Sequence, residues 1–529
     1  MKLVRSTFAL CLIFLVIMIE AEIVQKSCNA RSYGESQVVC VCDSSYCDTI
    51  PSIPALSDNQ IAVYTSDQRG LRLVYSNLTW NAERQPHWRR QRHTVVVKVN
   101  PSQKYQEILG FGGAFSDSTG INLVSLPARA RTHLLRSYFG PNSAGYTIGR
   151  VPIASCDFST RNYSYDDVKA DFSLTHFALA QEDLKYKIPF IWQANNLTNS
   201  SLKLFASPWS APAWMKSNND MTGMGWLLGK AGNKYHKTWA NYYVRFFDAY
   251  KAQNISFWGL TVQNEPTSGF IPNYAWQTMG YTPKMMRNFV KTDLGPTLNS
   301  SGYGHLKLMI HDDQRFFVNH FADVILSDPE AAKYVSGIGI HWYMDWFTSA
   351  KLLSKVHDKH PDYFMLGTEA CTGFQGPKFE RKPLLGNWAR GQAYANDIIE
   401  DLNNYVGGWV DWNMALDLKG GPNWVSNLAD SPVIVNSTSG EFYKQPMYYV
   451  MAHFSAFMPP KSVRIQTSSS GRSIETVGVI TPNKHRVLVI LNKSIVSQTV
   501  RVETAGNRAL SLKVTAKSLS TIVWPKSRQ

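Results

Sequence analysis

Eight short apolar runs, most of them separated by a helix-like stretch, fill the middle of the chain. They end near Phe111-Gly112-Gly113, Arg150-Val151-Pro152, Pro208-Trp209, Asn264-Glu265, His311-Asp312, His341-Trp342-Tyr343, Thr368-Glu369 and Asp411-Trp412-Asn413. Residues 283–293 and 387–405 have apolar side chains spaced by three and four, which indicates helices. Strand and helix repeated eight times is the pattern of a (β/α)₈ barrel, the TIM-barrel fold. We predict this barrel over residues 106–461.

The segments on either side of the barrel lack this alternation. Short strand-like runs at 476–481, 486–491, 499–503, 510–514 and 520–524 follow one another without a helix-length pattern, which favours a β-sandwich. Upstream strands at 71–75 and 93–99 are expected to join the same sheet, because chain ends often lie close together. We predict that residues 58–105 and 462–529 form the sandwich, and that residues 22–57 form a small disulfide-tied β unit.

The first 21 residues have the features of a secretory signal peptide. Lys2 and Arg5 precede an apolar run at 8–19, and the run is followed by Glu20-Ala21, where the small alanine suits cleavage of a signal peptide. The run is too short to span a membrane comfortably. Eight Asn-x-Ser/Thr sequons fit a secreted or luminal glycoprotein. The predicted glycosylation sites are Asn77, Asn162, Asn196, Asn199, Asn254, Asn299, Asn436 and Asn492.

Four cysteines cluster near the start of the mature chain. Cys28, Cys40, Cys42 and Cys47 predict two disulfides in an oxidising compartment, with three connectivities open. A zinc site is the rival interpretation, which such a compartment disfavours. Two further cysteines are expected to be free and buried as small apolar side chains, namely Cys156 and Cys371.

The chain is basic, with 54 Lys and Arg against 39 Asp and Glu and a formal net charge of +15. Nucleic acid is not an expected partner, because the chain carries no recognised nucleic-acid motif and is predicted to enter the secretory route. The charge fits either an ordinary solvated surface or attraction to anionic lipid.

Two glutamates lie at the ends of predicted strands. Glu265 ends the fourth strand and Glu369 the seventh, so a closed barrel would bring both to one rim. A retaining glycosidase needs two carboxyl groups about 5 Å apart, one as acid and base and the other as nucleophile. Asn264, directly before Glu265, could bond to the sugar 2-hydroxyl. Taken singly, each glutamate could be an ordinary surface carboxylate, but the pair favours catalysis.

A metal site is the competing chemistry at the same strand ends. The available ligands lack His-x-x-x-His or Asp-x-Asp spacing, so no metal is predicted; they are His311, Asp312, Asp313 and His341.

Several motifs around these residues resemble glycoside hydrolase family 30. The resemblance rests on Asn264-Glu265-Pro266, Ser207-Pro208-Trp209-Ser210 and Thr368-Glu369-Ala370-Cys371, and it extends from about Cys28 to the C-terminus. The match is closest to the members that cleave glucosylceramide. It is supported by further similar stretches at 154–159, 312–315, 420–425 and 442–447.

The resemblance implies a lysosomal β-glucosidase that cleaves glucosylceramide to glucose and ceramide with retention. Glu265 would be the acid/base, Glu369 the nucleophile, and Arg150 the group that orients the nucleophile. The implied sugar-contacting and mouth-lining residues are Asp157, Trp209, Asn264, His341, Tyr343, Trp412 and Asn427.

The resemblance also implies partners but no cofactor. The expected partners are an anionic membrane surface, a saposin-type activator and a lysosomal delivery receptor. The alternatives are a secreted or digestive β-glycosidase with another substrate, and a non-catalytic glycolipid-binding relative. The presence of both glutamates counts against the last.

Overall fold

The computed structural model describes residues 26–80, 94–374, 382–504 and 508–526; the predicted signal segment 1–21 lies outside them. The predicted (β/α)₈ barrel is confirmed, because eight strands close a parallel barrel in the order β10-β11-β12-β13-β6-β7-β8-β9. The strands are β6 (Gly110–Ala114), β7 (Ile148–Ile153), β8 (Lys203–Pro208), β9 (Gly259–Thr261), β10 (Lys307–Gln314), β11 (Gly337–His341), β12 (Phe364–Glu369) and β13 (Val406–Asn413).

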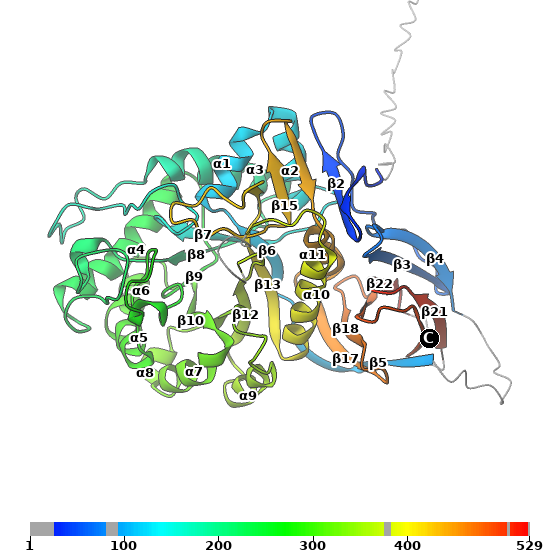
Figure 1. Cartoon of the computed structure of the whole chain (residues 1–529). Helices are drawn as coiled ribbons and strands as arrows, with labels where there is room; N and C mark the ends of the chain where they lie inside the picture. Colours follow the sequence, from blue (N-terminus) through cyan, green and yellow to red (C-terminus); the bar gives the residue numbers. More distant parts are fainter. Residues whose placement is uncertain (1–25, 81–93, 375–381, 505–507, 527–529) are drawn as a thin grey trace, which may run out of the picture.

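Helices surround this barrel on the left of Figure 1. They are α1 (Asp117–Ser125), α2 (Ala128–Phe139), α3 (Ile188–Leu197), α4 (Lys234–Ala252), α5 (Pro283–Phe289), α6 (Gly295–Ser300), α7 (Val318–Leu326), α8 (Pro329–Ala332), α9 (Lys351–Lys359), α10 (Trp388–Asn403) and α11 (Pro446–Ser455). No helix within the described residues is long and apolar enough to cross a membrane.

The two helices predicted from spacing begin at side-chain caps. Asn387 accepts from the backbone N–H of Arg390 at the start of α10, and Thr282 accepts from that of Met285 at the start of α5. The second helix differs from its prediction, because a π turn at Val290–Leu294 follows α5 and leads into α6. Pro296 comes two residues after this turn and has no N–H to donate, which favours the irregular turn there.

A nine-stranded sheet lies on the right of Figure 1. Its order is β21 (Arg508–Val514), β20 (Gln498–Thr504), β5 (Thr94–Glu107), β17 (Val463–Ser469), β18 (Ile474–Ile480), β19 (Arg486–Asn492), β22 (Ser518–Trp524), β3 (Gln60–Asp67) and β4 (Val74–Thr79). The expectation that upstream strands join the C-terminal ones is confirmed. Ile61 of β3 and Val500 of β20 belong to one apolar core, so the sheet is folded over on itself.

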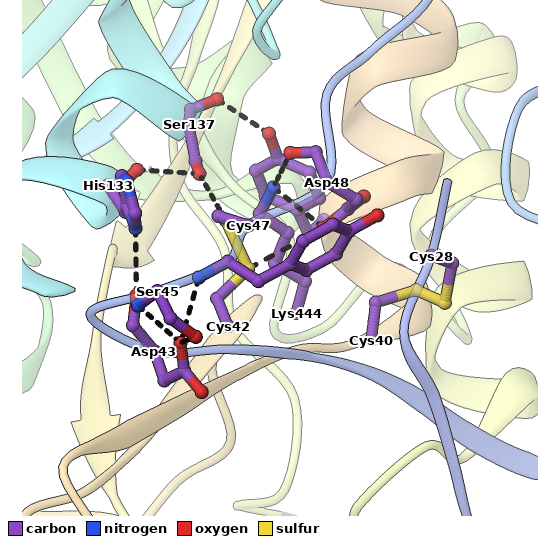
Figure 2. Close-up of a disulfide and its surroundings, with 12 residues drawn as sticks. Cys28, Cys40, Cys42, Asp43, Ser45, Cys47, Asp48, His133, Ser137 and Lys444 are labelled. Carbon is purple, nitrogen blue, oxygen red and sulfur yellow. Dashed lines mark hydrogen bonds and ion pairs between the residues drawn. A yellow bond between two sulfur atoms is a disulfide. The ribbon is translucent and has the colours of Figure 1, made fainter. Parts of the chain in front are cut away.

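The N-terminal unit contains the predicted two disulfides, and one of the three connectivities is realised: Cys28–Cys40 and Cys42–Cys47 (Figure 2). Its hairpin is not separate from the rest of the chain. It forms a five-stranded sheet in the order β1 (Ala30–Gly34), β2 (Gln37–Cys42), β16 (Glu441–Lys444), β15 (Val433–Asn436) and β14 (Leu416–Asp417). Beside the disulfide, the buried Lys444 ammonium lies 3.1 Å from the Asp48 carboxylate. The other two cysteines are free and buried, as expected.

One of the predicted glycosylation sites does not fit the fold. Asn492 is fully buried, and its side-chain nitrogen lies 2.7 Å from the Thr515 carbonyl and 3.1 Å from that of Val496. A glycan on this nitrogen would have no room, so the prediction for Asn492 is wrong. The other seven sites stay predictions; six are exposed and Asn436 is half-buried.

A buried histidine joins the last barrel helix to the nine-stranded sheet. His453 of α11 lies 2.8 Å from the Thr521 hydroxyl on β22 and 2.9 Å from the Ser66 hydroxyl on β3. Burial lowers the pKa of His453 to about 3, against 6.5 for an unburied histidine. The neutral imidazole is therefore part of the folded state.

This histidine predicts a loss of stability in acid. Between pH 6.5 and 3 the unfolded chain binds a proton at His453 that the folded chain does not, so stability falls as pH falls. At pH 5 the loss is about 2 kcal/mol relative to neutral pH. We expect His453→Gln to reduce the pH dependence of the unfolding free energy by that amount, measured by guanidinium unfolding at pH 7 and pH 5. His305→Gln, at an exposed histidine, is the control; equal pH dependence in both variants would contradict the prediction.

Candidate active site

The two predicted glutamates meet at the C-terminal rim of the barrel. Glu369 is the last residue of β12, whereas β9 ends at Thr261, four residues before Glu265, rather than at Glu265 as predicted. Glu265 instead sits in a bend at φ +41°, and its N–H donates to the Asp312 carbonyl at 2.9 Å. An oxygen of each glutamate and a nitrogen of His341 all lie within 4.8 Å of one another. This separation fits a retaining carboxylate pair.

Arg150 and Tyr343 hold the Glu369 carboxylate. The fully buried Arg150 guanidinium, from β7, donates to one oxygen of Glu369, and the Tyr343 hydroxyl donates to the other at 2.7 Å. Arg150 also donates to the Asn264 side-chain oxygen at 2.9 Å and to Asp312 at 3.0 Å. The predicted contact between Arg150 and Glu369 is therefore present in the structure.

The Glu265 carboxylate has a different set of partners. Gln314 donates to one oxygen at 2.8 Å, and His341 Nδ1 lies 3.1 Å from the same atom. The Tyr274 hydroxyl lies 3.3 Å from the other oxygen. The two glutamates thus share no hydrogen-bond donor among these residues, which lets each be positioned independently.

His341 lies behind the glutamates rather than at the mouth. The sequence analysis expected it to line the mouth, but its side chain is fully buried and its Nε2 lies 3.1 Å from Asp312. Burial alone would lower the pKa of His341, but Glu369, Asp312 and Glu265 outweigh burial and raise it to about 10. Burial would raise the pKa of Asp312, but Arg150 and His341 hold it well below its usual range. His341 is therefore an imidazolium that donates to Glu265.

A cavity of about 350 Å³ opens in front of the glutamates. Eight of the ten predicted site residues line it: Asp157, Trp209, Asn264, Glu265, Tyr343, Glu369, Trp412 and Asn427. The other two, Arg150 and His341, lie behind it. Trp209 and Trp412, which both line the cavity, stack on each other with ring centroids 5.0 Å apart.

Asp157 supplies a buried acid at the same cavity. Asn427 donates to it at 2.8 Å. Burial raises the pKa of Asp157 to about 7, against the effect of this hydrogen bond. In acid, Asp157 is therefore a neutral carboxylic acid that can donate as well as accept a hydrogen bond.

The outer wall of the cavity is apolar, and none of its side chains is among the predicted site residues. Its large side chains come from loops after β9, β11 and β12: Ile271, Tyr274, Trp276, Met344 and Phe374. Gln314, which contacts Glu265, was also missed, although its position at the end of β10 was a usable signal. The cavity therefore combines a polar inner end with an apolar outer end.

The geometry predicts unequal roles for two tyrosines. Tyr343→Phe removes a short hydrogen bond to a carboxylate, so we expect kcat/KM on a soluble aryl β-glucoside to fall about tenfold or more. Tyr274→Phe removes only a long contact, so we expect a change of less than about threefold. Steady-state kinetics of both variants test this, and an equal loss in the two would refute it.

Comparison with known proteins places this site in a family. The mouse protein named lysosomal acid glucosylceramidase is 42% identical over 500 residues, 94% of this chain and 95% of its own. A Caenorhabditis elegans relative that carries a glucosylceramidase name is 46% identical over 503 residues, 93% of this chain and 94% of its own. Among solved structures, SrfJ from Salmonella typhimurium is similar with a TM-score of 0.80 and 27% identity, covering 88% of this chain and all of its own.

Family models match both large parts of the chain. Residues 108–458 match the glycosyl hydrolase family 30 TIM-barrel domain, and residues 461–522 match the beta sandwich domain of the same family. The match to the barrel model alone covers more than half of the chain. The chain therefore belongs to glycosyl hydrolase family 30 and is a glycoside hydrolase.

Proposed function

We propose that this enzyme is a retaining β-glucosidase that hydrolyses glucosylceramide to glucose and ceramide in the lysosome. The observation that carries the proposal is the Glu265–Glu369 pair, held within 4.8 Å at the inner end of a cavity whose outer wall is apolar. The relatives named glucosylceramidase support the substrate, and the mouse relative's name supports the compartment. A secreted enzyme is the alternative fate.

In the first step, Glu369 attacks the anomeric carbon of the glucose. The bond from that carbon to the ceramide oxygen breaks, and Glu265 gives its proton to this oxygen. Arg150 and Tyr343 bond to the Glu369 oxygens and fix the direction of attack. Gln314 and His341 fix the Glu265 carboxyl group beside the leaving oxygen.

In the second step, water replaces the carboxylate of Glu369 at the anomeric carbon. Glu265, now ionised, takes the proton of that water, so glucose leaves with its original β configuration and both glutamates return to their starting state.

Asn264 and Asp157 are proposed to bind the sugar hydroxyls. The side-chain oxygen of Asn264 accepts from Arg150, which leaves its NH₂ group available to the sugar 2-hydroxyl. Asp157 and its partner Asn427 both line the cavity and offer polar groups to the sugar. The stacked Trp209 and Trp412 offer an aromatic face to the apolar face of the ring.

The outer wall argues for a lipid rather than a polysaccharide. More distant relatives include a Neurospora crassa endo-1,6-beta-D-glucanase, 27% identical over 482 residues. A glucan chain beyond the cleaved bond would need polar partners, whereas Ile271, Met344 and Phe374 suit the hydrocarbon of ceramide. The enzyme is also proposed to have three partners: an anionic membrane, a saposin-type activator and a lysosomal delivery receptor.

The test is hydrolysis of detergent-dispersed glucosylceramide at acidic pH by wild type, Glu265→Gln and Glu369→Gln. We expect both variants to lose about a thousandfold or more in kcat, because each removes one half of the acid–nucleophile pair. Azide should restore turnover of an activated aryl glucoside only to Glu265→Gln, because azide can replace the base-activated water. Glu330→Gln, at an exposed carboxylate, is the control.

Two outcomes would defeat the proposal. A Glu369→Gln enzyme with wild-type activity would rule out the assigned nucleophile. A wild-type enzyme that cleaves β-1,6-glucan but not glucosylceramide would move the substrate from lipid to polysaccharide.

A further inference from the structure

The bend that carries Glu265 is held in an uncommon backbone conformation. Glu265 has φ +41°, and on the neighbouring β10 His311 has φ +72° and Asp312 has φ +56°. Residues other than glycine rarely adopt this left-handed region, because it costs free energy. The pairing of β10 with β11 also shifts register between His311 and Asp313. Such a conformation persists only where surrounding contacts hold it, so the contacts around the bend help to place the Glu265 carboxyl group.

The backbone N–H groups of the bend are bound by β10. The N–H of Glu265 donates to the Asp312 carbonyl at 2.9 Å. The next residue, Pro266, has no N–H to donate. The first N–H after Glu265 is therefore that of Thr267, and it donates to the Asp313 carboxyl group at 2.9 Å. Two consecutive residues of β10 thus anchor the bend, one through its backbone and the other through its side chain.

The other oxygen of Asp313 holds a residue that itself contacts Glu265. It accepts from the backbone N–H of Gln314 at 2.7 Å, and the Gln314 side chain donates to Glu265 at 2.8 Å. One carboxyl group therefore bonds both to the segment that carries Glu265 and to the residue that donates to it. Asp313 is 1% exposed and lines the cavity, but it takes no part in either step of the proposed reaction.

Asp313 and Glu265 also affect each other's ionisation. Burial, and then the charge of Glu265, raise the pKa of Asp313 to about 7, against the effect of the N–H groups of Thr267 and Gln314. Two carboxyl groups that repel each other in this way are not both ionised in acid. The pair therefore keeps a proton below neutral pH, as the donation of a proton to the leaving oxygen requires.

We propose that Asp313 is a positioning residue for the acid/base, because its carboxyl group fixes both the bend at Glu265 and the end of β10 that carries Gln314. The inference rests on the proposed function, in which Glu265 donates a proton to the leaving oxygen. A residue with this role affects only those reactions that need the proton. A residue that binds the glucose, or that only supports the fold, affects all β-glucosides alike.

The experiment compares two aryl β-glucosides that differ in their need for an acid. Phenyl β-glucoside needs a proton on its leaving oxygen, whereas 2,4-dinitrophenolate leaves without one. We expect Asp313→Ala to lower kcat/KM about a hundredfold on the phenyl substrate, because a displaced acid donates its proton poorly. On the dinitrophenyl substrate, kcat/KM should change by less than about threefold.

Asp313→Asn gives an intermediate case. Asparagine keeps one acceptor oxygen, for one of the two N–H groups, while its NH₂ group faces the other. We expect a loss of about tenfold in kcat/KM on the phenyl substrate, and again little change on the dinitrophenyl substrate. Because this substitution preserves the size of the side chain, it decides the question if Asp313→Ala does not fold, which thermal unfolding of each variant would show.

Asp67→Asn is the matched control. Asp67, at the end of β3, is 3% exposed and accepts from the backbone N–H groups of Arg69 at 2.9 Å and Leu71 at 3.1 Å. It therefore resembles Asp313 in burial and bonding, but it belongs to the nine-stranded sheet rather than the barrel. We expect Asp67→Asn to change kcat/KM by less than about threefold on either substrate.

Glu265→Gln, measured on the same two substrates, separates this inference from the proposed function. A selective loss on the phenyl substrate in Glu265→Gln and in both Asp313 variants would support the inference. A selective loss in Glu265→Gln, with an equal loss on both substrates or no loss in the Asp313 variants, would overturn the inference alone. An equal loss on both substrates in Glu265→Gln would defeat the assigned acid, and the inference with it.

Discussion

The buried guanidinium of Arg150 is the group on which the active face depends. Burying a charge costs several kcal/mol, and here Asp312 and Glu369 supply the compensating charges while Asn264 and Ser207 accept further hydrogen bonds. These partners come from β8, β10, β12 and the segment after β9, so one side chain sets the spacing of four strand ends. The centroid of the Trp209 ring lies 4.9 Å from the same guanidinium, so Arg150 and its charged partners contact a residue of the cavity wall.

The barrel was predictable because its signal is local and repeated. Each strand is a short apolar run, and helices such as α10 begin at a cap that the chain itself supplies in Asn387. The pairing of β2 with β16 could not be predicted in the same way, because nothing near Cys42 indicates a partner such as Phe442, four hundred residues away. The buried position of Asn492 was hidden for the same reason: a sequon is a local pattern, whereas burial is a property of the whole fold.

The candidate site also contains residues that local sequence patterns reveal and residues whose positions depend on the whole fold. Glu265 and Glu369 could be identified because they follow apolar runs within recognisable motifs, whereas the role of Arg150 was implied only by the family resemblance. How deeply a side chain is buried is harder to predict. His341 was expected on the active face because it ends a strand, but its contact with Asp312 holds it behind that face. The apolar outer wall was missed because loop residues such as Ile271 and Phe374 carry no periodic signal.

The five-stranded and nine-stranded sheets each combine strands from the two ends of the chain, and this decides the order in which the fold can be completed. The two disulfides join cysteines only 12 and 5 residues apart, so they can close soon after these residues enter an oxidising compartment. Strands β2, β3 and β5 must wait for β16, β22, β17 and β20, which all lie beyond the last strand of the barrel. Open strand edges invite pairing with other chains. During synthesis the newly made chain therefore carries these edges until its final segment arrives, and that segment ends the period of greatest exposure to aggregation.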